Sequence, residues 1–200
     1  KCNMKCSYCK DRKRHGKHMD RNLFIRLCGE AGKEGIVHIT GGEPLLVPWL
    51  EEEIYNQRGT TRITLSSNLL IKPQTKTLNS IFRLKTSLDD YEANNWNKMV
   101  GGYFFQIVVK NIAYCSGNHD LVSICYTATH QNAHKLKRFI QFAKNNFPKL
   151  HSLSVSFYKG EDNDCRLTSS DIKMLYEAAQ DMDLLSKQLF LETHSRKGNY

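Results

Sequence analysis

The stretch GIVHITGGEPLLVPWLEEEIYNQRGTTRITLSSN, residues 35–68, holds a β-rich run, a glycine loop, a helical run and a second β-rich run. The first run ends in Gly41-Gly42, and the second ends in the polar letters SSN. Pro48 stands in the first turn of the helical run, where proline is tolerated. A strand, a helix and another strand in this order are typical of a parallel sheet wound with helices.

The same alternation continues through the rest of the chain. Asp20 is suited to cap a helix in which Leu23, Phe24 and Leu27 are spaced for one apolar face. We predict further strands at 81–90, 120–130, 149–158 and 189–194, and helices at 21–35, 72–80, 91–117 with a break at Gly101-Gly102, 132–147 and 168–188, the last capped by Ser169 or Asp171. The pattern fits an open sheet or a barrel, and in both folds ligands bind beyond the carboxyl ends of the strands.

The composition indicates one globular domain spanning residues 1–200. Apolar residues make up 40% and charged residues 24%, and no run approaches the roughly 20 apolar residues of a membrane span. No signal peptide is visible. The seven cysteines are an odd number, clustered at one end, which fits a reducing compartment better than a disulfide framework. We therefore expect a cytoplasmic protein that does not enter a membrane.

The formal charge of +9 is densest in KDRKRHGKH, residues 10–18, which suits a solvated loop, a phosphorylated substrate or RNA. One alternative without catalysis is a basic zinc-binding module for RNA interaction, with Cys6, Cys9, His15 and His18 as ligands. Its two ligand pairs are separated by five residues, far fewer than the roughly 12 of a zinc finger. It also leaves Cys2 and the GGEP segment without a role.

The amino-terminal segment KCNMKCSYCK places Cys2, Cys6 and Cys9 on one short loop. Thiolates are soft ligands that suit zinc and iron–sulfur clusters. In a cubane with four irons, three cysteines leave one iron free to hold a small molecule. A zinc or structural thiol cluster is the alternative interpretation of the triplet.

The segment CNMKCSYC, followed one strand later by HITGGEP, resembles the radical S-adenosylmethionine superfamily. The three cysteines match its CxxxCxxC loop, with Tyr8 as the aromatic before the last cysteine, and residues 41–44 match its GGEP segment. The runs TLSSNLLI, RLKTSLDD and SVSFYKGEDND are similar to later strand ends of the molybdenum-cofactor protein A group. That group is in turn similar to the peptide-modifying SPASM/twitch enzymes.

The resemblance implies an α/β fold, a partial (βα)6 TIM-like barrel with the cysteine loop after its first strand, so we expect that strand to lie before Lys1. It implies a 4Fe–4S cluster on Cys2, Cys6 and Cys9 whose open iron binds S-adenosylmethionine. Reductive cleavage of this cofactor gives a 5′-deoxyadenosyl radical that abstracts hydrogen from a peptide or small-molecule substrate. The implied partners are that substrate and an electron donor such as flavodoxin or ferredoxin. The alternative within the superfamily is an RNA-modifying enzyme.

The resemblance also suggests cofactor-binding residues at the strand ends. Glycine lets a backbone approach a ligand closely, Glu43 offers an anion to an ammonium group, and serine hydroxyls can bind the ribose or the methionine moiety. The predicted set is Tyr8, Gly41, Gly42, Glu43, Ser66, Asn68 and Ser87. We nominate no general acid or base, because hydrogen abstraction by a radical does not require one.

Several features depart from the GTP-cyclising enzymes of the resembled group. Val47 stands where they carry an arginine, the run LVSICYT lacks the basic residue expected for a triphosphate, and neither a second set of cluster cysteines nor a carboxyl-terminal Gly-Gly is found. GTP cyclisation is therefore not expected. His130 and Tyr158 are candidates for a substrate pocket, and Cys165 for another functional thiol. His38 is expected to face a helix, and Cys28 and Cys125 to be buried structural thiols.

Overall fold

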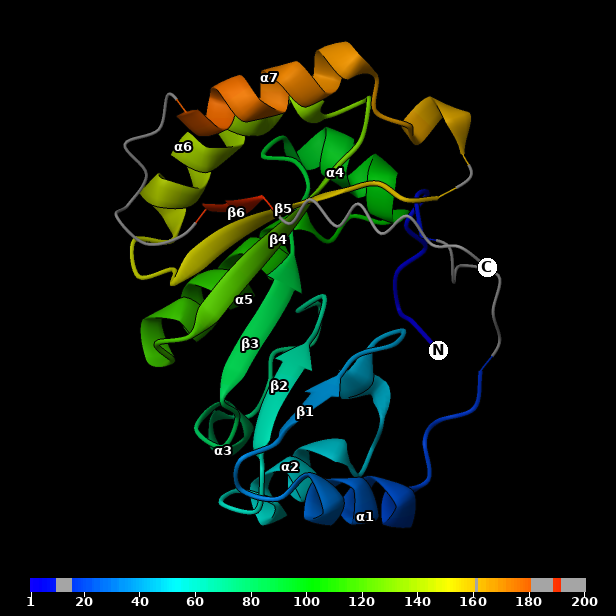
Figure 1. Cartoon of the computed structure of the whole chain (residues 1–200), viewed down its shortest axis with the longest axis vertical. Helices are drawn as coiled ribbons and strands as arrows, with labels where there is room; N and C mark the ends of the chain where they lie inside the picture. Colours follow the sequence, from blue (N-terminus) through cyan, green and yellow to red (C-terminus); the bar gives the residue numbers. More distant parts are fainter. Residues whose placement is uncertain (10–15, 161, 181–188, 192–200) are drawn as a thin grey trace.

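A computed structural model describes residues 1–9, 16–160, 162–180 and 189–191 of the chain. Within these residues, a six-stranded parallel sheet is flanked by helices (Figure 1). The strands are β1 (Ile36–Ile39), β2 (Arg62–Ser66), β3 (Arg83–Ser87), β4 (Val122–Ala128), β5 (Ser152–Phe157) and β6 (Leu189–Leu191). The helices are α1 (Arg21–Ala31), α2 (Leu50–Asn56), α3 (Thr75–Leu78), α4 (Ala93–Val100), α5 (Phe105–Asn118), α6 (Leu136–Asn146) and α7 (Ser169–Gln180), with short 3-10 turns at Pro44–Leu46, Ala133–Lys135 and Asn163–Cys165.

The order of the strands identifies the type of fold. Each strand pairs in parallel with the next strand along the chain, which gives the order β1-β2-β3-β4-β5-β6. A doubly wound sheet would reverse its order at a switch point. A constant direction with right-handed crossovers places the connecting helices on one face, as in a barrel. The predicted partial barrel is therefore confirmed.

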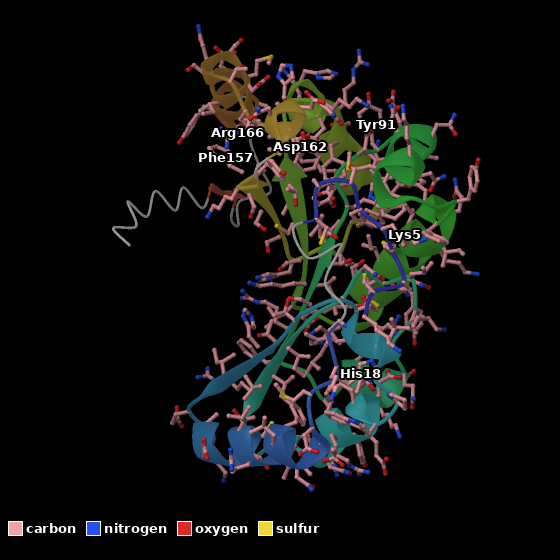
Figure 2. All side chains as sticks on the ribbon, turned by 90° about the vertical axis from the view of Figure 1, so that its right-hand side faces the viewer. Lys5, His18, Tyr91, Phe157, Asp162 and Arg166 are labelled. Carbon is pink, nitrogen blue, oxygen red and sulfur yellow. The ribbon has the colours of Figure 1, made fainter. Side chains whose placement is uncertain are left out.

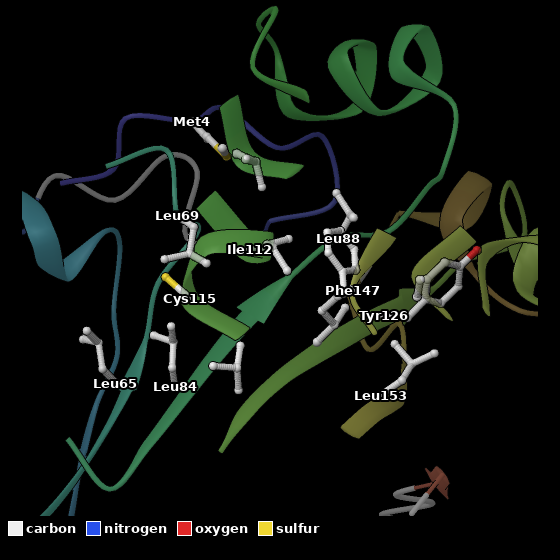
Figure 3. Close-up of a cluster of buried hydrophobic side chains, with 14 of the residues drawn as sticks. Met4, Leu65, Leu69, Leu84, Leu88, Ile112, Cys115, Tyr126, Phe147 and Leu153 are labelled. Carbon is white, nitrogen blue, oxygen red and sulfur yellow. The ribbon is translucent and has the colours of Figure 1, made fainter. Parts of the chain in front are cut away.

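The two faces of the sheet differ sharply, because successive side chains of a strand point to opposite sides. On one face, Leu65 and Leu84 lie with Ile112 and Cys115 of α5 in the buried core (Figure 3). We call the other side the inner face. From β2 to β5 it carries only hydroxyl, thiol or basic side chains: Arg62, Thr64, Ser66, Arg83, Lys85, Ser87, Ser123, Cys125, Thr127, Ser152, Ser154 and Ser156.

Helix α1 begins as predicted, but its buried face is different. The Asp20 carboxylate accepts a hydrogen bond from the Leu23 amide, which caps the helix. The side chains that enter the core are Phe24 and Cys28, and Phe24 packs against Trp49 with ring centroids 5.7 Å apart. The prediction that Leu23 and Leu27 share the buried face with Phe24 was wrong, because both are 36% exposed.

Three smaller expectations are also corrected. Pro48 precedes α2, which begins at Leu50 after the cap residue Trp49. Helix α7 is capped by Thr168, not by Ser169 or Asp171, since the Thr168 hydroxyl accepts from the Asp171 amide and the Asp171 carboxylate accepts from the Thr168 amide. The predicted helix residues 181–188 and strand residues 192–194 lie outside the described residues.

His38 and Cys125 both belong to the inner face. His38 is exposed, because Val37 and Ile39 take the positions against the helices. The expectation that His38 faces a helix was therefore wrong. Cys28 is fully buried as expected, whereas Cys125 is only half-buried.

The correction on α1 can be tested with two neighbouring residues of the same helix. We expect Phe24→Ala to lower the free energy of unfolding by about 3–5 kcal/mol, because it leaves a cavity in the core. Leu23→Ala should cost less than about 1 kcal/mol, because its side chain is partly in water. Urea denaturation of both variants measures the difference, and equal losses would show that Leu23 belongs to the core.

Candidate functional site

The amino-terminal loop that carries the three cysteines, residues 1–9, is attached to the end of α4. The Lys5 amide donates to the Val100 carbonyl at 3.0 Å, and the Ser7 amide donates to the Met99 carbonyl at 2.9 Å. Met4, which is 7% exposed, inserts its side chain into the core beside Leu69 (Figure 3). These contacts fix the backbone between Cys2 and Cys9. The loop is therefore held in place by the rest of the fold.

The thiols of the loop differ in environment. Cys2 and Cys9 are exposed, and Cys6 is half-buried. Burial raises the pKa of the Cys6 thiol to about 12, and the negative charges of Asp89, Cys2 and Cys9 add to this effect. Cys6 therefore lies close enough to both other cysteines for their charges to interact.

The thiolates of the loop are ligands that suit either a zinc ion or an iron–sulfur cluster. Among the described residues, no three or more His, Cys, Asp or Glu side chains gather to hold one metal ion. Each cysteine of a cubane binds a different iron, so its ligands lie farther apart than those of one zinc ion. Of the zinc alternative's ligands, His15 lies outside the described residues, and His18 is exposed.

The glycine loop after β1 packs directly on the start of the cysteine loop. The Glu43 amide donates to the Lys1 carbonyl at 2.9 Å. A Cβ atom on Gly42 would lie 2.0 Å from the same carbonyl oxygen, so only glycine leaves room for this contact. Gly41 has φ +140°, a conformation that other residues rarely adopt. Gly42 is thus required for the close approach of the two loops, and Gly41 for the conformation of the glycine loop.

The Glu43 carboxylate is turned into the protein and is 3% exposed. One oxygen accepts hydrogen bonds from the Leu45 amide at 3.0 Å and the Ser67 hydroxyl at 2.8 Å, and the other accepts from the Asn68 amide at 2.8 Å. Burial raises its pKa, although these hydrogen bonds oppose the effect. Glu43 therefore joins the glycine loop to the end of β2. A contact with an ammonium group stays a prediction.

The end of β2 also reaches the cysteine loop. The side-chain nitrogen of Asn68, Nδ2, donates to the Asn3 side-chain oxygen at 2.7 Å and lies 3.7 Å from the Cys2 sulfur. Ser66 and Ser87 end their strands on the inner face and are half-buried. The structure thus brings Asn68 to the first cysteine, with Ser66 and Ser87 on neighbouring strands below the loops.

Asp89 is a site residue that the sequence analysis did not select. Its carboxylate accepts hydrogen bonds from the Tyr8 hydroxyl and, at 2.6 Å, from the Thr127 amide, and the Asn132 side chain donates to its carbonyl oxygen at 2.9 Å. It therefore connects the cysteine loop to the carboxyl ends of β3 and β4. In the sequence, only the acidic pair at the end of SLDD, residues 87–90, points to Asp89, and the sequence analysis selects Ser87 alone from this segment.

The candidates for a substrate pocket lie in the loops after β4 and β5. The His130 Nδ1 atom is 2.8 Å from the Asp171 carboxylate, and the His130 side chain is 56% exposed. The Tyr158 hydroxyl accepts from the Asp162 amide at 3.3 Å, and the Cys165 thiol, which is buried, points at the Asp162 carboxylate. None of these contacts joins them to the cysteine loop, and Figure 2 shows Asp162 well away from Lys5.

Comparison with known proteins agrees with this geometry. A family model described as the radical SAM superfamily matches residues 1–143. The chain belongs to the radical SAM superfamily. A probable GTP 3′,8-cyclase of Methanococcus maripaludis is 30% identical over an alignment of 123 residues that covers 56% of this chain and 41% of that protein. A second, from Archaeoglobus fulgidus, is 29% identical over 119 residues, covering 56% of this chain and 40% of its own. The chain thus spans about two fifths of the length of these relatives.

Solved structures share the fold. Native anSMEcpe with bound AdoMet has a TM-score of 0.74 and 18% identity, and the match covers 96% of this chain and 61% of that one. Streptococcus suis SuiB bound to S-adenosylmethionine has a TM-score of 0.70 and 17% identity, with 90% and 44% covered. Radical SAM proteins are enzymes that use a 4Fe–4S cluster and S-adenosylmethionine, and they require an electron donor and a substrate. No described helix of this radical SAM chain is long and apolar enough to cross a membrane.

The close approach at Gly42 gives a direct test of the site. We expect Gly42→Ala to lower the free energy of unfolding by about 1–3 kcal/mol, as overpacking does, and to reduce the iron retained after anaerobic reconstitution. Gly117→Ala is a suitable control, because nothing lies within 4 Å of its added Cβ. Unchanged iron content and stability in Gly42→Ala would show that the two loops need not touch.

The buried carboxyl of Asp89 predicts a dependence of stability on pH. Burial raises the pKa of Asp89 from 3.8 to about 6, with hydrogen bonds from Tyr8 and Thr127 opposing the shift. Between these values the folded state keeps a proton that the unfolded state has released. The stability of the wild type relative to Asp89→Asn should therefore fall as pH rises from about 4 to about 6, and then stay level.

Urea unfolding at several pH values measures this difference, with Asp120→Asn as a matched replacement of a carboxylate at an exposed position. A relative stability of Asp89→Asn that is constant from pH 4 to 7 would contradict the burial of an ionisable carboxyl at this position.

Proposed function

We propose that residues 1–200 form the core domain of a radical S-adenosylmethionine enzyme, with a 4Fe–4S cluster on Cys2, Cys6 and Cys9. The observation that carries the proposal is the meeting of three segments at one point. The Lys1 carbonyl contacts Gly42 and Glu43, and the Asn68 side chain lies beside Asn3 and Cys2. Three soft ligands beside exposed backbone and amide groups suit a cluster that shares a small-molecule ligand.

When bound, the reduced cluster and S-adenosylmethionine supply a 5′-deoxyadenosyl radical that takes a hydrogen atom from the substrate. The chain's own residues hold and orient these groups. Gly41 has open space where a side chain would begin, so a ligand can approach its backbone, whereas Gly42 makes room for the Lys1 carbonyl. Glu43 keeps their loop against β2. Ser66 and Ser87 offer hydroxyls from the inner face at the ends of their strands.

Tyr8 and Asn68 complete the proposed cofactor site from two sides. The Tyr8 hydroxyl is fixed by Asp89, and it also lies close to the Cys6 thiol. The side-chain amide of Asn68 approaches the sulfur of Cys2 and can adjust the charge density on that thiolate. The two residues would therefore orient the cluster without binding iron themselves.

We propose a peptide or a small molecule as substrate, and we do not assign GTP cyclisation. The similarity to probable GTP 3′,8-cyclases covers 56% of the chain. Val47, which replaces a basic residue of those enzymes, packs half-buried against the core. On the inner face, β4 carries only the uncharged residues Ser123, Cys125 and Thr127. The basic side chains that the resemblance would place at these two positions for a triphosphate are therefore absent there.

The cysteine assignment is tested by cofactor cleavage. After anaerobic reconstitution with iron and sulfide, the wild type should convert S-adenosylmethionine to 5′-deoxyadenosine when dithionite is added. Cys6→Ala should abolish this product, because the cluster loses one of its three protein ligands. Chromatographic quantification of 5′-deoxyadenosine measures both.

Cys28→Ala is the matched control, since it removes a thiol that lies in α1 and is fully buried. It should keep cofactor cleavage if it remains folded. Product formation by Cys6→Ala at the wild-type rate would overturn the proposed cluster site.

A further inference from the structure

The inner face of the sheet is unusual for a barrel. The interior of a TIM barrel is normally filled by bulky branched residues, which make it a packed core. Here the corresponding positions on β2 to β5 carry serine, threonine, cysteine, lysine and arginine. The Ser123 and Ser152 hydroxyls lie 2.8 Å apart, and the Cys125 sulfur is 3.3 Å from the Ser156 hydroxyl. Such a face offers hydrogen bonds to a ligand rather than apolar contacts.

Three of the basic side chains of this face lie on two strands, His38 on β1 and both Arg83 and Lys85 on β3, with β2 between them. Lys85 pairs in register with Ser66 of β2 and Ser123 of β4. Arg83 lies two residues earlier on the same face of β3, beside Thr64, and Thr64 in turn pairs with His38 of β1. Burial lowers the pKa of His38, and the positive charges of Lys85 and Arg83 lower it further. The three groups therefore interact electrostatically.

Among the residues that the structure describes, no carboxylate of the inner face balances these charges. The inward positions of β1 to β5 include no Asp or Glu among the residues that the structure describes. Within the same residues, the side-chain amine of Lys85 forms no hydrogen bond or ion pair, and the Nε atom of Arg83 is buried without a hydrogen-bond partner.

Another partly buried lysine shows the contrast. The Lys135 amine lies 2.7 Å from Asp90 and 2.9 Å from Glu92, so its charge is fully paired. Unpaired cations beside hydroxyl donors form a favourable environment for an anion. The inner face therefore lacks an anion that would complete the interactions of Lys85 and Arg83.

We propose that the inner face binds an anionic group of the substrate, a phosphate or a carboxylate, between Lys85 and Arg83. The hydroxyls of Ser66, Ser123 and Ser152, level with Lys85, are placed to donate further hydrogen bonds. This inference rests on the proposed function, because it identifies the substrate of the radical enzyme as a small anionic molecule.

The position suits a substrate that reaches the reactive end of the sheet. Lys85 precedes Ser87 by two residues on the same face, which is about 7 Å along the strand. An anion held at Lys85 therefore leaves the rest of a small molecule directed at the carboxyl ends of β2 and β3. The Asn68 side chain, near the Cys2 sulfur, follows β2 there.

The test is calorimetric titration of the reconstituted protein with two probes, inorganic pyrophosphate and succinate. We expect one of them to bind the wild type and to bind the double variant Lys85→Met/Arg83→Met roughly tenfold more weakly or worse, as the loss of hydrogen bonds from charged groups implies. Preference for pyrophosphate would identify a phosphate group on the substrate, and preference for succinate a carboxylate.

Two controls separate the site from general effects. Lys33→Met/Lys110→Met removes the same charge from exposed positions and should bind the probe within about twofold of the wild type, if binding is local. Lys85→Arg keeps the charge and should retain most of the affinity. Binding by this variant would show that the loss in the methionine variant comes from the missing charge and not from misfolding. Binding of neither probe to the wild type, or an equal loss in the surface variant, would overturn the proposal.

The same wild-type sample is assayed for 5′-deoxyadenosine. The titration does not depend on that product, so failure of the radical chemistry and failure of the anion site give different results.

Discussion

The hydrogen bond between the Glu43 amide and the Lys1 carbonyl is the contact on which the site depends. It holds the cysteine loop on the end of β1, and the lack of a side chain at Gly42 makes it possible. The Glu43 side chain then ties the same turn to Ser67 and Asn68 after β2. Glu43 thus binds the cysteine loop through its backbone amide and the end of β2 through its carboxylate.

A second buried carboxylate repeats this arrangement on the other side of the loop. Asp89, after β3, accepts hydrogen bonds from Tyr8 in the cysteine loop and from Thr127 in β4. Two buried anions at the carboxyl ends of neighbouring strands therefore position the loop by hydrogen bonds rather than by apolar packing alone. Such an arrangement is rigid, because a buried carboxylate that loses a partner is costly. Rigidity of this kind suits a loop that must hold three ligands at fixed separations.

Much of the fold was predictable because its signals are local. The alternation of strands and helices, the Asp20 cap and the break at Gly101-Gly102 depend on residues close together in sequence. The buried face of α1 was not predictable from the sequence. Leu23 and Phe24 are both apolar, and only the docking of the helix on the sheet selects Phe24 for the core. The site shows the same limit.

Within the candidate site, the cysteine triplet and the glycine loop can be selected from the sequence by their spacing and by the resemblance they carry, but the partners of Glu43 and Tyr8 cannot. Ser66 and Ser67 are neighbours with the same side chain, and the two-residue period of a strand decides that only Ser67 reaches Glu43. Asp89 is 81 residues from Tyr8 in sequence, so no local pattern could join them. Contacts between distant loops arise only once the sheet has been assembled.

The central claim is that the three cysteines hold a cluster with one iron open to S-adenosylmethionine. Electron paramagnetic resonance of the reconstituted, dithionite-reduced protein tests it most directly, recorded before and after the addition of S-adenosylmethionine. We expect the signal of one reduced 4Fe–4S cluster per chain, changed in shape when the cofactor binds its open iron. Bound zinc without an iron signal, or a cluster signal that S-adenosylmethionine leaves unchanged, would contradict it.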